Sequence, residues 1–372
     1  MTKIETLCKE LREIAANPGK STDALKAKTG KKLVGMGPVY SPEEIAIAAG
    51  AIPIGIWGGQ KSIQKARAEL PPFVCSIMQS VKELELAGAY DNLDAVIFTS
   101  LCDTLKNMGQ KWKGKAPLIQ FAHPQMRVME ASNVYLAEEY RHVAARLEKA
   151  LGVKITEDKL TEAIEICNAN RVALQEFTKA AAEHPELISP ANRHMVIKAR
   201  YFMERADHTA KIKELTAELK AAPVVPWKGK KIILTGITAE PTELLDIFAE
   251  FGMAVVGDDL AQESRQFRTL VPDGTDPYYR LAKQWQNLEA CSVVGDTKRI
   301  HGPVLMNMLK EKGADAIVVC MMKFCDPEEF DYAVYNTQFD AAGVRHLMIE
   351  IDQEATSFEQ ARTRIQSFSE ML

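Results

Sequence analysis

The two halves of the chain carry the same pattern of strand-forming and loop-forming residues, which restricts the fold to a few architectures. Four residues recur 199 positions later and two recur 202 positions later, in the same order: Lys32, Gly37, Pro42, Glu44, Gly50 and Gly55 with Lys231, Gly236, Pro241, Glu243, Gly252 and Gly257. A shared order of spaced matches indicates an internal duplication. We therefore expect two similar structural units in one polypeptide.

Each half also contains a β-branched run that opens with Asp-Ala and is followed by Cys-Asp. The run after Asp94-Ala95 leads to Cys102, and the run after Asp315-Ala316 leads to Cys325. Short apolar runs of this kind are typical of parallel strands that are buried on both faces. Each Cys-Asp pair would then lie in the loop that leaves the carboxyl end of a strand, which is where ligands bind in open α/β sheets.

A third cysteine, Cys75, stands at a predicted helix start. It follows Pro71-Pro72 and precedes a segment with apolar residues at helical spacing. A helix N-terminus favours a thiolate. Two facing sheets would bring their strand ends into one interdomain cleft, where three remote thiolates could hold a metal centre with one open coordination position.

These patterns predict an α/β protein with two flavodoxin-like parallel-sheet domains, related by the internal repeat and separated by a helical insert. The predicted organisation is listed by residue range: an N-terminal helical segment at 1–30, a first α/β domain at 31–124, a helical insert or linker layer at 125–226, and a second α/β domain at 227–372. Pro223-Val-Val-Pro226 marks the clearest domain boundary.

Composition narrows the class of protein. The 372 residues are 47% hydrophobic and 26% charged, which is typical of a globular chain with a substantial core. A net charge of -4 gives no electrostatic reason to expect binding to nucleic acid or to a membrane surface. No apolar run could span a bilayer, and the N-terminus lacks the apolar core of a signal peptide, so we expect a cytoplasmic protein. Seven cysteines in no framework spacing disfavour secreted-type disulfides.

The cysteines also permit a simpler interpretation, because a cysteine in an α/β core is most often a small buried hydrophobic residue. We expect packing alone for four of them: Cys8, Cys167, Cys291 and Cys320. For Cys75, Cys102 and Cys325, their loop positions and the repeated Cys-Asp favour a site. No Cys-x-x-Cys pair supports a ribbon-type zinc site, and no phosphate loop or nucleophile elbow is present.

Several segments resemble the 2-hydroxyacyl-CoA dehydratase and benzoyl-CoA reductase family, most closely the β-subunits of the dehydratases. The segments are residues 37–44 (Gly-Pro-Val-Tyr-Ser-Pro-Glu-Glu), 55–59 (Gly-Ile-Trp-Gly-Gly), 75–80 (Cys-Ser-Ile-Met-Gln-Ser), 102–105 (Cys-Asp-Thr-Leu), 123–125 (His-Pro-Gln) and 323–329 (Lys-Phe-Cys-Asp-Pro-Glu-Glu). They extend over nearly the whole chain. Each one is weak alone, and together they are specific.

The resemblance implies a [4Fe–4S] cluster held by three cysteines, which on this chain are Cys75, Cys102 and Cys325. It implies a heterodimer with a homologous α-subunit, a transient ATP-hydrolysing iron–sulfur activator, and an acyl-CoA substrate bound mainly at the α-subunit. The reaction would be reversible elimination of water from an (R)-2-hydroxyacyl-CoA to an (E)-2-enoyl-CoA through a ketyl radical anion. This chain would then relay electrons, so no general acid or base is assigned to it. An accessory flavin also belongs to these expectations.

Three alternatives stay open from sequence. One is a benzoyl-CoA-reductase-type subunit, and another is a non-catalytic two-domain binding protein with packed cysteines. The third is a hydrolase with a mononuclear zinc ion on three cysteines. The acyl group is not specified by any pattern in the sequence.

Overall fold

A computed structural model describes residues 1–295 and 298–372. Its first half contains these elements: α1 Lys3–Ala16, α2 Pro18–Thr29, β1 Leu33–Met36, α3 Glu43–Ala48, β2 Ile52–Gly55, η1 Ala66–Ala68, α4 Ser76–Leu86, β3 Ala95–Thr99, α5 Asp103–Lys111, β4 Leu118–Phe121, α6 Glu130–Leu151, α7 Glu157–Glu183 and α8 Pro190–Lys198. The second half contains η2 Ala199–Phe202, α9 Arg205–Ala221, β5 Lys230–Gly236, α10 Thr242–Glu250, β6 Met253–Leu260, α11 Ser264–Phe267, α12 Pro277–Asn287, α13 His301–Lys312, β7 Ala316–Met322, α14 Asp326–Ala342, β8 His346–Ile351 and α15 Glu359–Met371.

The strands form two four-stranded sheets, and every strand pair is parallel. The strand order is β2-β1-β3-β4 in the first sheet and β6-β5-β7-β8 in the second. Both orders begin like the flavodoxin-like order 2-1-3-4 and reverse direction between their second and third strands. The prediction of two parallel-sheet units is confirmed, and their identical strand order supports the predicted repeat.

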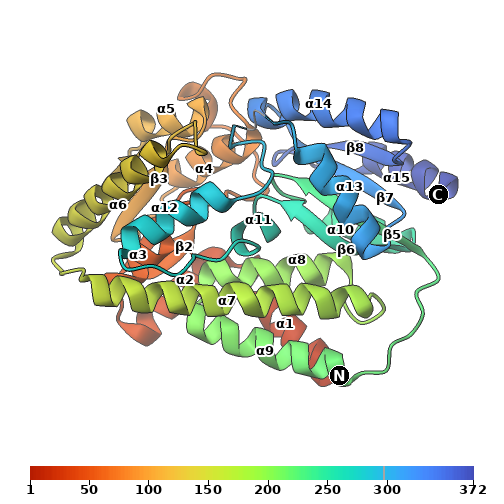
Figure 1. Cartoon of the computed structure of the whole chain (residues 1–372), viewed down its shortest axis with the longest axis horizontal. Helices are drawn as coiled ribbons and strands as arrows, with labels where there is room; N and C mark the ends of the chain where they lie inside the picture. Colours follow the sequence, from red (N-terminus) through yellow and green to blue (C-terminus); the bar gives the residue numbers. More distant parts are fainter. Residues whose placement is uncertain (296–297) are drawn as a thin grey trace.

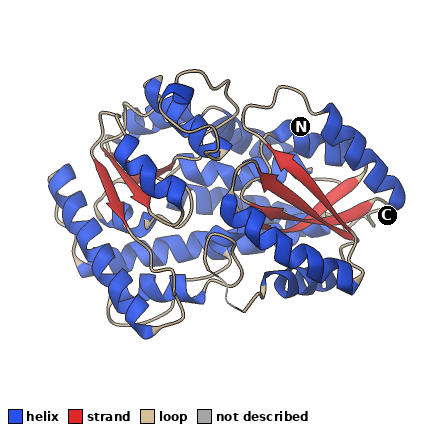
Figure 2. Cartoon of the chain, turned by 90° about the horizontal axis from the view of Figure 1, so that it is seen from above, coloured by secondary structure: helices blue, strands red, loops and turns tan. Residues whose placement is uncertain are grey.

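Helices cover both faces of the second sheet because its strands are apolar on both sides. On one face, Ile233, Ile317 and Val319 pack against α13 and α14. On the other face, Leu234 and Val318 belong to a larger core that includes α10, α15 and the whole first sheet. One continuous core therefore joins the two sheets, which Figure 2 shows on opposite sides of the molecule.

A helical layer of α1, α7, α8 and α9 forms a third core beneath the two sheets (Figure 1). Two of its helices begin at residues that cap them. The Thr156 side chain accepts from the Lys159 N–H at the start of α7, and the Ser189 side chain accepts from the Asn192 N–H at the start of α8. This layer occupies much of the predicted insert. The proposed division into domains itself stays a prediction.

Three local features depend on contacts beyond the sequence pattern. Ser41 does not cap α3, because its hydroxyl donates to the carbonyl of Gly37, 3.0 Å away, and Pro42 takes the cap position. Strand β6 continues to Leu260 through the segment 257–259, because a shift in register at Ile232/Ile233 keeps that segment paired with β5. A further helix, α2, begins directly at Pro18, since proline suits the first helical turn.

Candidate metal centre

Cys75, Cys102 and Cys325 all occupy the cap position at a helix N-terminus. They precede α4, α5 and α14, respectively. The Leu105 N–H donates to the Cys102 sulfur across 3.5 Å. Cysteine, rather than the aspartate that follows it, therefore occupies the cap position of the helices that leave β3 and β7. Because a helix N-terminus carries partial positive charge, all three positions favour an anionic sulfur.

The three thiols are close enough to influence one another electrostatically. Burial raises the pKa of Cys75, backbone N–H groups lower it and a charge on Cys102 raises it, so that the pKa is about 12. Burial also holds the pKa of Cys325 well above its usual value, and charges on Cys75 and Cys102 add to this rise. The pKa of Cys102 is likewise raised, mainly by burial. Three thiolates would thus repel one another here unless a cation neutralised them.

Ser76 holds the start of α4 against the end of the second sheet. Its backbone N–H donates to the Lys323 carbonyl at 3.4 Å, and its hydroxyl donates to the Met322 sulfur at 3.0 Å. The Gln353 N–H donates back to this hydroxyl at 3.1 Å. These contacts place Cys75 beside the loop that carries Cys325, although 250 positions separate the two residues in sequence.

The loop before Cys325 has a strained backbone. Phe324 adopts a φ of 61°, and a bulky residue is disfavoured in this left-handed region by about 1–2 kcal/mol. The turn persists because both neighbours are fixed: the Lys323 N–H donates to the Ile351 carbonyl at 2.9 Å, and the Cys325 N–H donates to the Met322 carbonyl at 3.0 Å. Such strain is common at functional sites.

The spacing of the sulfurs distinguishes a cluster from a single metal ion. Zinc–sulfur bonds of about 2.3 Å require ligand sulfurs within roughly 4 Å of one another. Within the described ranges, the three cysteine sulfurs do not form a group with all members within 4.8 Å. The thiols are therefore too widely spaced for one zinc ion, whereas a polynuclear cluster binds each cysteine through a different iron. Three cysteines at helix N-termini are the donor type that an iron–sulfur cluster requires.

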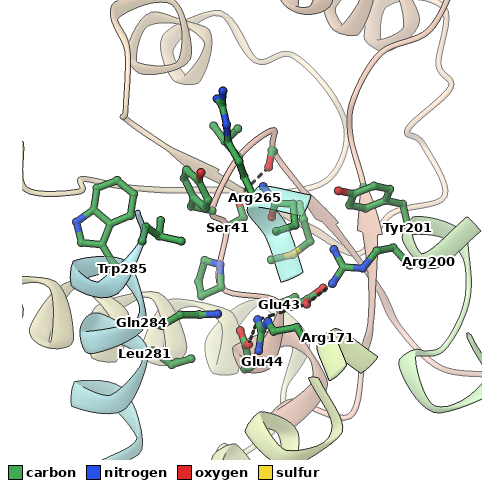
Figure 3. Close-up of a pocket in the computed structure, with 18 of the residues that line it drawn as sticks. Ser41, Glu43, Glu44, Arg171, Arg200, Tyr201, Arg265, Leu281, Gln284 and Trp285 are labelled. Atoms are coloured by element: carbon green, nitrogen blue, oxygen red, sulfur yellow. Dashed lines mark hydrogen bonds and ion pairs between the residues drawn. The ribbon is translucent and has the colours of Figure 1, made fainter. Parts of the chain in front are cut away.

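A small interdomain cavity of about 60 Å³ lies at the ends of β1 and β2 (Figure 3). Tyr40 and Trp285 narrow it with an edge-to-face contact whose ring centroids are 5.5 Å apart. Tyr40 and its neighbour Val39 both have positive φ angles, near 55°, so this loop is also strained. Ligand-binding cavities usually measure about 300–1,000 Å³, so this space suits a few water molecules rather than an acyl thioester.

Glu43 and Glu44 border this cavity and lie near Cys167, in a group that has the spacing of a metal site. Figure 3 shows arginines directed at both carboxylates. Arg200 and Arg205 bind Glu43 at 2.8 and 2.6 Å, and Arg171 binds Glu44 at 2.5 Å.

The electrostatics of this group exclude a metal role. Burial alone would raise the pKa of Glu43, but three guanidinium groups overcome that effect and hold this pKa well below its usual value. The same positive charges would repel a divalent cation. Burial also keeps the pKa of the Cys167 thiol well above its ordinary value. We assign the group to structural ion pairing.

A second buried charge network supports the helix that Cys325 caps. His301 donates to Asp259 at 2.6 Å and to Asp331, on α14, at 2.5 Å. Arg265 donates to the same Asp259 at 2.7 Å and lies 3.7 Å from Glu328, in the first turn of α14. Burial raises the pKa of Glu328. The network therefore fixes α14 from two sides.

We expect this network to make stability depend on pH. Burial lowers the pKa of His301, but Asp259 and Asp331 outweigh burial and raise it from 6.5 to about 9. Protonated His301 therefore contributes about 3 kcal/mol to the free energy of unfolding. This contribution is complete below pH 6.5 and is lost as the pH rises through 9. Urea unfolding of the metal-free chain from pH 6 to 10 measures it. His301→Gln should be less stable at pH 6 and should flatten the profile, whereas unchanged profiles would contradict this assignment.

The four cysteines that we expected to pack in the interior do so. Cys8, Cys167, Cys291 and Cys320 are at most 3% exposed. Cys320 lies inside β7, within the core. The imidazoles of His123 and His346 take part in hydrogen bonds with Thr99 and Asn336, as expected for ordinary polar residues.

Sequence reasoning missed several residues around the centre. Ser76 follows Cys75 directly, but a serine in a first helical turn has no special meaning by itself. Glu328 stands three residues after Cys325, at the position of the acidic residue in a capping box. This spacing was the only sequence pattern that could have pointed to Glu328. Arg265 and Gln353 lie in segments without a recognisable pattern.

Two parallel sheets that present three helix-capping cysteines at one shared edge define an α/β protein with a candidate polynuclear thiolate centre. Residues 38–372 match the family described as 2-hydroxyglutaryl-CoA dehydratase, D-component. The chain belongs to this family.

The relatives of this chain include dehydratase β-subunits. The lactoyl-CoA dehydratase subunit beta of Anaerotignum propionicum is 56% identical over the whole of both chains. The (R)-phenyllactyl-CoA dehydratase beta subunit of Clostridium sporogenes is 41% identical over the same extent. The (R)-2-hydroxyglutaryl-CoA dehydratase subunit beta of Acidaminococcus fermentans is 36% identical over 99% of this chain and 100% of its own. Among the described helices, none has the length and apolar character needed to cross a bilayer.

Proposed function

We propose that this chain, the β-subunit of a 2-hydroxyacyl-CoA dehydratase and hence part of a hydro-lyase, holds a [4Fe–4S] cluster on Cys75, Cys102 and Cys325 and relays electrons. The observation that supports the proposal is that three cysteines from both halves of the chain stand at helix N-termini and influence one another electrostatically, beside the Ser76 contacts. When bound, the cluster would supply a one-electron couple of low potential.

The proposed reaction is redox-neutral but requires a transient electron. One electron added to the thioester carbonyl gives a ketyl radical anion, which expels the 2-hydroxyl group. Loss of a C3 proton then lets the electron return, so the net change is loss of water. In this scheme the residues of this chain ligate the cofactor, donate backbone N–H groups to its sulfurs and exclude water from its surroundings.

The acyl-CoA would bind to the partner α-subunit. The small volume of the cavity beside Tyr40 and Trp285 supports this arrangement, because about 60 Å³ is too little for an acyl thioester. An electron would then have to pass from this chain to the partner. An ATP-hydrolysing iron–sulfur activator would provide that electron.

Exposed phenylalanines near the cysteines support a permanent partner at this face. Phe73, Phe324 and Phe330 are 69%, 40% and 80% exposed, and each lies within five residues of Cys75 or Cys325. Interfaces of permanent complexes are apolar, whereas transient redox contacts are small. We therefore infer that the α-subunit, rather than the activator, covers this surface.

The accessory flavin stays a prediction. A cavity of about 440 Å³ lies between α2, the loop after β2 and the start of α10, with Trp57, Tyr90 and Phe202 in its lining. Its volume and aromatic lining would suit a flavin ring. Flavin analysis of the purified heterodimer tests this prediction directly.

The function is tested by turnover of the reconstituted complex. The chain should co-purify anaerobically with its α-subunit, and the complex with activator, ATP and reductant should convert a 2-hydroxyacyl-CoA to the enoyl-CoA. Lactoyl-CoA is the first substrate to test because of the 56% identical relative, followed by phenyllactyl-CoA and 2-hydroxyglutaryl-CoA. Reduction of benzoyl-CoA, without dehydration of any hydroxyacyl-CoA, would favour the reductase alternative.

The relay role has its own control. Cys75→Ala in this chain should reduce turnover at least 100-fold while acyl-CoA binding to the complex changes less than twofold. Loss of binding together with turnover would show that this chain holds the substrate.

A further inference from the structure

Gln353 is a buried amide that lacks hydrogen-bond partners for its side chain. It is 1% exposed, and neither Nε2 nor Oε1 is paired with any residue that the structure describes. Buried amides without partners destabilise a folded chain and are uncommon. We infer that Gln353 donates a side-chain N–H to a sulfur atom of the cofactor that the three cysteines would hold. This inference rests on the proposed function.

The position of Gln353 favours this assignment. It follows β8, at the same carboxyl edge of the second sheet from which Cys325 projects. Its backbone N–H donates to Ser76, the residue after Cys75, at 3.1 Å, and its carbonyl accepts from Lys61 at 3.0 Å. Both backbone groups are therefore fixed, one of them by the residue next to Cys75. The side chain is left as a free donor close to the cysteine loops.

A donor of this kind would set the potential of the cofactor. Reduction adds negative charge to the sulfurs, and an N–H group directed at them stabilises the reduced form and raises the potential. The three helix N-termini already provide backbone donors. Gln353 would add a donor from the second sheet that a single substitution removes, without affecting any ligand.

The experiment is a redox titration of the anaerobic heterodimer, followed by electron paramagnetic resonance. Gln353→Met keeps the length of the side chain and removes its donors. We expect full iron content and about a tenfold lower ratio of reduced to oxidised cluster at a fixed potential, which is about 59 mV for one electron. Gln175→Met is the matched control, because the Gln175 amide binds Phe267 and Arg268 in the helical layer. Its titration should coincide with that of the unmodified protein.

The outcomes separate this inference from the proposed function. An unmodified heterodimer without an iron–sulfur signal would contradict the proposed function itself. A normal signal with an unchanged titration in Gln353→Met would overturn only the role of Gln353. If the Met variant loses iron, Gln353→Leu replaces it, since leucine is uncharged and carries no hydrogen-bond donor. An unchanged potential in that variant would equally overturn the inference.

Discussion

Replacement of Cys75, Cys102 or Cys325 by alanine should abolish the cluster in the anaerobically purified chain. Each of these thiols caps a different helix, so no other cysteine is placed to substitute for a lost ligand. We expect about four iron and four sulfide per unmodified chain and less than about one iron in each variant. Iron and sulfide analysis, with the absorbance near 400 nm, measures the change.

The controls are cysteines of the same chemistry in other environments. Cys8→Ala and Cys320→Ala should keep the iron content, because Cys8 packs in the helical layer and Cys320 lies inside β7. Cys320 is the stricter control, since it stands five residues before Cys325. Retention of iron in Cys325→Ala together with its loss in Cys320→Ala would refute the placement of the centre at the strand ends. Zinc alone in the unmodified chain would restore the mononuclear alternative.

Glu43→Gln should lower the free energy of unfolding by about 3–5 kcal/mol. Glu43 accepts from Arg200 and Arg205 inside the protein, and its carboxylate offsets two guanidinium charges there. A neutral amide would leave these charges buried and uncompensated. Urea unfolding of the metal-free chain at neutral pH measures the loss.

The matched control is Glu10→Gln, which removes an exposed ion pair with Lys211, 2.6 Å long. Such surface pairs contribute about 0–1 kcal/mol, so its effect should stay in that range. Added zinc or calcium should not raise the melting temperature of the unmodified metal-free chain through this site. A rise that Glu43→Gln abolishes would mean that Glu43, Glu44 and Cys167 bind metal after all.

Local sequence patterns predict the positions of the cysteines, but they do not predict the contacts of the residues around them. The run from Asp94 to Thr99 predicts a buried parallel strand, and the position of Cys102 after that run follows from the same pattern. The cap position of Cys75 was predictable because Pro71-Pro72 ends one element and an apolar helical period begins directly afterwards. Ser41 stands where a helix cap is typical, but its hydroxyl donates to the Gly37 carbonyl in the turn after β1, a contact that local sequence does not predict.

The sequence by itself determined the two parallel sheets, their repeat and the placement of three cysteines at element ends, since these depend on residue spacing along a few turns or strands. Only the tertiary structure decided that Ser76 contacts Met322 and that the side-chain amide of Gln353 has no hydrogen-bond partner among the described residues. The tertiary structure also decided that arginines form ion pairs with Glu43 and Glu44. These contacts join residues more than 100 positions apart, and their geometry depends on how whole faces of sheets and helices pack. No local period encodes that packing, because it is a property of the assembled core.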